Sequence, residues 1–220
     1  MKSLFRAIAA AVADGKDAHA NYRQLVSEAH RLVRPCRVLV SQGTGDVAGR
    51  WYGEDLPSGP MAGLRRWMSF RLDLVPGIED GERRIATVYT STTEGRTSEV
   101  VLSSDWPDPS GTPLFAVAAD SFPPLEALGE YGVNLPPNLR KTSPGSLEGR
   151  SFEEEFIKRH PFHSRGPWAI LGGWNIPWED EDWLECSHQR LLLTTVAEPE
   201  PWLEVYQLKD GTFTVKERFS

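Results

Sequence analysis

Short apolar runs separated by glycine- and proline-rich connections are the feature that most constrains the fold of this chain. Residues 68–74 alternate apolar and polar side chains, which is the period of a half-buried strand. Residues 85–93 are rich in β-branched side chains, which favour strands. Because the connections are too short for helical crossovers, we expect a largely antiparallel sheet. Further runs of strand length occupy residues 36–40, 99–103, 114–119, 191–196, 202–208 and 212–219.

The N-terminal residues are predicted to form helices, and the C-terminal residues a hairpin. Apolar residues recur at helical spacing over residues 3–13, and a second helix is predicted from Asp17, its N-cap, until Pro35 stops it. The sequence Lys209-Asp210-Gly211 between the last two runs is typical of a hairpin turn. We therefore predict an α+β fold with an N-terminal helical pair, a largely antiparallel β-sheet and a C-terminal β-hairpin.

The middle of the chain determines how many domains are expected. A short helix is predicted over residues 125–131, and a capping box formed by Ser151 and Glu154 opens another that ends near Arg159. The proline-rich residues between these helices are typical of a linker. A single α+β domain over residues 1–220 is the simplest interpretation, with a possible boundary near residues 136–150.

Charge and cysteine content exclude several classes of partner. The chain has 24 Lys and Arg against 31 Asp and Glu, a net charge of −7. Nucleic acid and anionic membranes require a basic face, so neither is expected as the main partner. Two cysteines are too few for a disulfide scaffold, which indicates a reducing compartment. The alanine-rich start is interrupted by Arg6 and lacks a cleavage site, so we expect it to be retained in a cytoplasmic protein.

Tryptophans gather in the acidic C-terminal part of the chain. Residues 151–220 carry thirteen Asp and Glu against seven Lys and Arg, whereas residues 1–50 carry four against eight. Exposed rings can anchor a basic protein while carboxylates steer it. Two alternatives are an aromatic cage for a cationic ligand and plain burial of the rings. The predicted partner-binding residues are Trp174, Trp178, Glu179, Asp180, Glu181, Asp182 and Trp183.

Four side chains in the same region are of the type that zinc accepts. They are His160, His163, Cys186 and His188. An extended backbone would place the last two on one face. The spacing matches no standard zinc module, so loop histidines and a buried thiol are the favoured interpretation. A metal-dependent hydrolase of unrecognised family that uses this cluster is the enzymatic alternative.

Signatures of nucleotide binding and nucleophilic catalysis are not met. The glycines of residues 43–49 do not fit the G-x-G-x-x-G spacing, and Trp51, Gly53 and Pro57 break the helix that should follow. No G-x-S-x-G motif is present, and neither cysteine lies in a known local signature. These observations favour a binding protein over an enzyme. A structural component of a larger assembly is a third possibility.

The C-terminal residues also resemble a known family. The stretch Leu171-Gly172-Gly173-Trp174, the pair Pro177-Trp178 followed by acidic residues and Trp183, and residues 198–205 before the final hairpin are similar to bacterial polymorphic-toxin immunity proteins of the immunity protein 52 type. The resemblance covers Trp168 to Phe219, about a quarter of the chain. It implies a cytoplasmic inhibitor that occludes a cognate toxin, with no cofactor and no catalysis.

Overall fold

The computed structural model describes residues 20, 22–52, 63–78, 84–91, 97–124, 128, 169–174, 189–195 and 202–218. The chain divides into two compact units. The first comprises Met1–Val33 with Phe122–His160, and the second comprises Arg34–Ser121 with Pro161–Ser220. Among the residues that the structure describes, none belongs to a helix long and apolar enough to cross a membrane.

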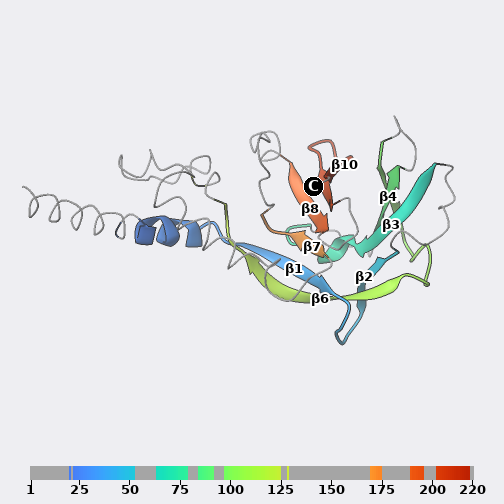
Figure 1. Ribbon diagram of the computed structural model, residues 1–220, viewed down its shortest axis with the longest axis horizontal. Coiled ribbons are helices and arrows are strands. Elements are labelled where there is room, and N and C mark those ends of the chain that lie inside the picture. The colour runs from blue at the N-terminus through green and yellow to red at the C-terminus, as the bar shows by residue number, and fades with distance from the viewer. Residues whose placement is uncertain are drawn as a thin grey trace, which may run out of the picture. The chain divides into compact units, whose positions relative to one another are not determined.

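A single antiparallel sheet of ten strands makes up the described part of the second unit (Figure 1). The strands are β1 (Arg34–Val40), β2 (Val47–Trp51), β3 (Leu64–Arg71), β4 (Ile85–Ser91), β5 (Glu99–Ser103), β6 (Thr112–Ser121), β7 (Ala169–Gly172), β8 (Arg190–Thr195), β9 (Trp202–Gln207) and β10 (Phe213–Arg218). Their order across the sheet is β10-β9-β8-β7-β1-β6-β2-β3-β4-β5, and all neighbours pair antiparallel.

The sheet curls until its two outermost strands meet. Figure 1 shows β8 and β10 on one side and β3 and β4 on the other, with β1 and β6, which connect the two groups in the strand order, running below them in this view. The end strands β5 and β10 are in contact, and the Ser98 hydroxyl donates a hydrogen bond to the Glu217 carboxylate at this seam. The result is a nearly closed barrel, which leaves little strand edge exposed.

Aromatic and aliphatic side chains fill the interior of the barrel. The bulge between Arg66 and Met68 inserts Trp67 as an extra residue of β3, and this ring is fully buried. It meets Trp51 edge to face, with ring centroids 5.1 Å apart. The other large buried members of this core are Leu39, Met68, Phe70, Leu72, Leu114, Leu171, Leu192, Leu193, Leu203 and Val205.

The connection after β3 turns into the barrel. It begins with a 3₁₀ turn, η1 (Leu72–Leu74), and continues to residue 78. Leu72 and Val75 belong to the barrel core. A methyl group on Gly172 of β7 would lie 3.0 Å from Pro76 Cδ, so this connection packs closely against a strand from the other half of the sheet. It therefore crosses one end of the barrel.

The first unit contributes a small core of its own. Residues 22–30 are helical, and Leu25 and Ala29 are buried on one face of this helix. They pack with Phe122 and Leu128, and the His30 ring contacts Phe122 edge to face at a centroid distance of 5.6 Å. The spacing of apolar residues had predicted this helical face.

The predicted α+β class with a helical pair is wrong. Within the described residues the fold is mostly antiparallel β, with one continuous helix at residues 22–30, and its sheet is nearly closed on itself. The first expected helix, over residues 3–13, and those at 125–131 and 151–159 lie outside the described residues, apart from a helical residue 128. The antiparallel sheet and the hairpin of β9 and β10 are confirmed. Pairing around the barrel, rather than helices on a sheet face, buries the apolar strand faces.

Candidate functional site

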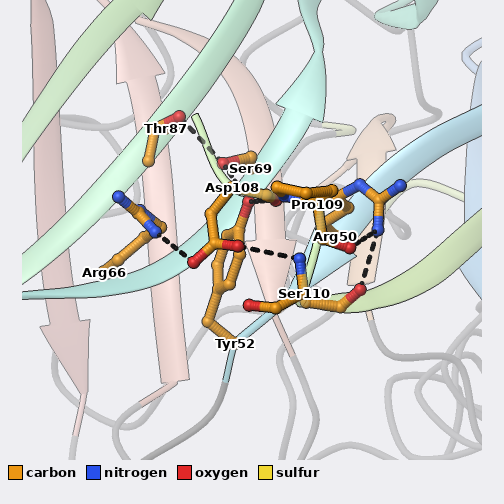
Figure 2. Close-up of polar contacts among 9 residues, drawn as sticks. Arg50, Tyr52, Arg66, Ser69, Thr87, Asp108, Pro109 and Ser110 are labelled. Atoms are coloured by element: carbon orange, nitrogen blue, oxygen red, sulfur yellow. Dashed lines mark hydrogen bonds and ion pairs between the residues drawn. The ribbon is translucent and has the colours of Figure 1, made fainter. Parts of the chain in front are cut away.

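The connection between β5 and β6 is attached to the sheet by several side chains from β2 and β3 (Figure 2). We call residues 104–111 the anchored loop. The Tyr52 hydroxyl donates a hydrogen bond to the carbonyl oxygen of Asp108 at 3.0 Å. Arg66 Nη1 donates to Asp108 Oδ2 at 2.8 Å, which also forms an ion pair. Asp108 thus receives bonds from Arg66 of β3 and from Tyr52, the residue that follows β2.

A second set of bonds holds the end of the anchored loop. Arg50 Nη1 donates to the carbonyl oxygens of Pro109 at 2.6 Å and Gly111 at 2.9 Å. Gly111 lies against the Tyr52 ring, where an added Cβ would be 2.6 Å from a ring carbon. Only glycine allows the backbone to approach the ring this closely. The anchored loop is therefore fixed by both hydrogen bonds and packing.

Buried hydroxyl groups of β3 and β4 contact the Tyr52 hydroxyl and extend the hydrogen bonds that hold the anchored loop. Ser69 of β3 lies opposite Thr87 of β4, and their hydroxyl oxygens are 2.8 Å apart. Ser69 Oγ also donates to the Tyr52 hydroxyl at 3.3 Å. Burial raises the pKa of Tyr52, so its hydroxyl stays protonated as the donor to the anchored loop. The three hydroxyl groups form a chain that fixes the direction of the tyrosine.

The Asp108 carboxylate connects the anchored loop to Arg66 and also bonds within the loop itself. Hydrogen bonds from the Ser110 side chain and from its backbone N–H, together with the Arg66 charge, lower the pKa of this carboxyl group. The backbone bond, from Ser110 N to Asp108 Oδ1, is 2.8 Å long. The carboxylate is thus ionised at neutral pH while it bends the anchored loop into a turn.

The lowered pKa of Asp108 predicts a stabilisation that depends on pH. A depressed carboxyl pKa stabilises the fold above the ordinary value near 3.9, and this contribution disappears as the pH falls through the folded value. We expect Asp108→Asn to lower the free energy of unfolding by about 0.5–1 kcal/mol at pH 7. The difference should shrink below about pH 4. Chemical denaturation across this range measures it, with Asp105→Asn as control. A difference constant down to pH 3 would contradict the assignment.

The anchored loop presents an aromatic and acidic surface. Its exposed residues include Asp105, Pro107 and Pro109, and Trp106 is half-buried beside them. The guanidinium of Arg50 lies 5.6 Å from the centroid of the Trp106 ring. Two prolines and the bonds to Arg50 limit the conformations of this segment. The surface is consequently held in one shape by contacts within the protein itself.

Trp174 is buried, whereas an anchor residue for a partner protein would be exposed. Its ring is 3% exposed, and the Arg34 guanidinium is stacked 3.4 Å from the ring centroid. Its backbone N–H donates to Ser121 Oγ at 2.9 Å. The preceding Gly173 has a φ of +82°, and an added Cβ would come within 2.8 Å of Ser121 Cβ. The Gly-Gly-Trp motif is therefore explained by packing at the end of β7.

The remaining predicted residues are not placed by the structure. Trp178, Glu179, Asp180, Glu181, Asp182 and Trp183 lie outside the described residues, as do His160, His163, Cys186 and His188. Within the described ranges, no group of three or more metal-ligating side chains could hold an ion. The acidic tryptophan surface and the zinc cluster both stay predictions.

The sequence interpretation missed the anchored loop because it treated these residues as an ordinary connection. A signal was present in Asp108-Pro109-Ser110-Gly111, where an aspartate two residues before a serine N–H favours an Asx turn. Nothing local shows that Arg50 and Arg66 meet this turn, since they lie 59 and 42 residues away from their partners. Only the pairing of the strands brings them together.

Cys36 of β1 is a buried thiol. Burial, and to a lesser extent the charge of Asp120, raises the pKa of Cys36 to about 12. Such a thiol is almost entirely protonated at neutral pH and is a weak nucleophile. No catalytic role for Cys36 follows from this environment.

Cys36 should therefore resist alkylation in the folded protein. Because the thiolate is roughly a thousandfold scarcer than in an unperturbed cysteine, we expect iodoacetamide at pH 8 to modify it at least a hundredfold faster after unfolding in urea. Peptide mass spectrometry locates the modification. Equal rates in the folded and unfolded chain would show that the thiol is accessible.

Comparison with known proteins gives no relative. No family model matches the sequence, and neither a curated protein nor a solved structure matches the chain. The fold and the site therefore define this protein only as a nearly closed antiparallel barrel that carries an anchored, aromatic and acidic loop.

Proposed function

We propose that this protein is a binding protein of the immunity type, which occludes a cognate toxin in the cytoplasm of the producing cell and needs no cofactor. The observation that supports this best is the anchored loop. Arg50 Nη1, the Tyr52 hydroxyl and Arg66 Nη1 donate hydrogen bonds that hold it, while Asp105, Pro107 and Pro109 stay exposed. A surface built in this way suits recognition of another protein.

The energetic argument rests on preorganisation. Association costs free energy for each loop and side chain that must be ordered, so a loop already fixed by its own protein keeps more of its contact energy. Trp106 offers the type of aromatic side chain that often dominates binding energy. Asp105 beside it, together with the net charge of −7, would steer a basic partner.

Substitutions on the anchored loop test the proposal. The first step is to look beside the gene for a large secreted protein with a variable C-terminal domain; that domain is then the probe, expressed with and without this chain. We expect the chain to protect cells, and Trp106→Ala to weaken binding of the purified domain by about 30-fold or more, the effect of a hot-spot residue. Asp105→Lys should slow association and reduce its salt dependence. Calorimetry and stopped-flow binding measure these effects.

Asp46→Lys is the matched control, because the Asp46 side chain is 81% exposed, lies in a different connection, and forms an ion pair with Arg71 that is 3.6 Å long. It should bind and protect as the wild type does. Failure of the folded wild-type chain to protect against the neighbouring domain would contradict the immunity function. Unchanged binding by both anchored-loop variants would place the contact surface elsewhere.

The acidic run Glu179-Asp180-Glu181-Asp182 stays the second candidate for the contact surface. Reversal of its four charges is expected to weaken binding and to change its salt dependence, since clustered carboxylates act mainly on association. The same calorimetric titration, done at low and moderate ionic strength, compares this variant with the anchored-loop variants. Unchanged affinity and unchanged salt dependence would remove the run from the interface.

A further inference from the structure

A cavity of about 460 Å³ opens at one end of the barrel. Its walls come from the first half of β1, the last half of β6, and the connection after β3 that crosses this end. The volume lies within the range of small-molecule sites in proteins. The cavity is separate from the anchored loop, whose residues do not line it.

The register of β1 and β6 explains why the cavity exists. Arg37 lies opposite Ala118, and Leu39, two residues further along β1, is in the barrel core. Because side chains alternate across a strand, Arg37 and Ala118 point to the same interior side as Leu39. Ala118 is nevertheless exposed. A methyl group stands where a larger side chain would have filled the end of the barrel.

Two opposite charges face this space. Asp120 lies two residues beyond Ala118 on the same side of β6, so its Cβ is diagonal to that of Arg37 at roughly 7–8 Å. Within the described ranges, neither Arg37 nor Asp120 forms an ion pair or a side-chain hydrogen bond. Asp73, the third charged residue of the wall, is already bound by Arg71, whose Nη2 lies 2.5 Å from Asp73 Oδ2.

An apolar wall completes the cavity. It is formed by Leu74, Val75 and Ile78, all contributed by the connection that crosses the barrel end. Val75 is buried, and Leu74 and Ile78 pack against the barrel core, so this wall is held in place. Among the described residues, the cavity thus combines a cation and an anion that have no ion-pair partner with an apolar surface.

We propose that this cavity binds a small zwitterion with an apolar side chain, of the α-amino acid class. The carboxylate would lie on Arg37, whose planar guanidinium can donate two parallel hydrogen bonds. The ammonium group would lie on Asp120, and the side chain would pack on Val75 and Ile78. A zwitterion neutralises the charges of Arg37 and Asp120 at once, whereas a simple anion or cation neutralises only one of them.

Calorimetric titration with three related compounds tests the charges of the ligand. L-leucine carries both charges, L-leucinamide lacks the carboxylate, and 4-methylpentanoate lacks the ammonium group. We expect leucine to bind, and each analogue to bind about tenfold more weakly or worse, because each loses one charge-assisted hydrogen bond. Absence of heat with leucine up to about 10 mM, or equal affinity for all three compounds, would overturn the proposal.

Variants of the cavity assign each charge to its partner. Arg37→Gln should weaken leucine about tenfold but leave leucinamide unaffected, and Asp120→Asn should weaken leucine but leave 4-methylpentanoate unaffected. Ala118→Leu fills the space and should abolish leucine binding while cooperative unfolding is kept. Arg31→Gln is the matched control for the arginine, since the Arg31 side chain is 73% exposed and belongs to the other unit. Wild-type leucine affinity in all three cavity variants would exclude this site.

Discussion

Replacing Trp67 with alanine is expected to lower the free energy of unfolding by about 3–5 kcal/mol. The Trp67 ring is fully buried, and it meets Trp51 edge to face inside the barrel. Its removal leaves a large void in the barrel core, and the structure around such a void relaxes only in part. Urea denaturation followed by circular dichroism gives the value, provided that the slope with denaturant is unchanged.

Two other tryptophan variants make this result specific. Trp106→Ala removes a half-buried ring from the anchored loop and should cost far less stability than Trp67→Ala. Trp67→Phe keeps part of the ring and should recover more than half of the loss. If Trp67→Ala cost less than about 1 kcal/mol, the ring would not be part of the barrel core.

Gly111→Ala should detach the anchored loop. The added methyl group would lie 2.6 Å from the Tyr52 ring and 3.0 Å from the carbonyl oxygen of Trp51, so either the ring or the loop backbone must move. We expect a loss of about 1–3 kcal/mol in unfolding free energy, the cost of overpacking at a rigid contact. Amide hydrogen exchange of residues 104–111 should rise at the same time, and the proposed toxin affinity should fall.

Thr112→Ala is the neighbouring control for this effect. Thr112 is exposed at the start of β6, so its truncation should change stability by less than about 0.5 kcal/mol and leave exchange in the anchored loop unchanged. The assignment would be contradicted if amide exchange of residues 104–111 became faster in Thr112→Ala, or if it stayed at the wild-type rate in Gly111→Ala. Either result would show that contact with Tyr52 does not hold the loop.

Local pattern predicted most of the individual strands. The expected run at 99–103 coincides with β5, and those at 85–93, 191–196 and 202–208 differ from β4, β8 and β9 by two residues or fewer at each end. Two strands were missed. In β2 the glycine and the bulge next to it break the alternation. The four residues of β7 are all buried, so this short run shows no alternation that would identify a strand.

Long-range arrangement could not be predicted in the same way. The order of the strands places β7 beside β1 and β10 near β5, although these pairs are far apart in the sequence. Closure of the sheet depends on summed twist and on pairing between such distant segments, and neither leaves a local pattern. The cavity could not be predicted from the sequence for the same reason. Arg37 and Asp120 each look like an ordinary surface charge until β1 and β6 are paired.

The seam between β5 and β10 has a consequence for how the chain is made. The β9–β10 hairpin comes last among the described strands, whereas β5 is made about a hundred residues earlier. During synthesis, β5 therefore waits with an uncovered backbone edge, which is a template for pairing with a strand from another molecule. The hydrogen bond between Ser98 and Glu217 can form only after the hairpin has emerged from the ribosome. Completion of the barrel, rather than formation of any single hairpin, would then protect the newly made chain from aggregation.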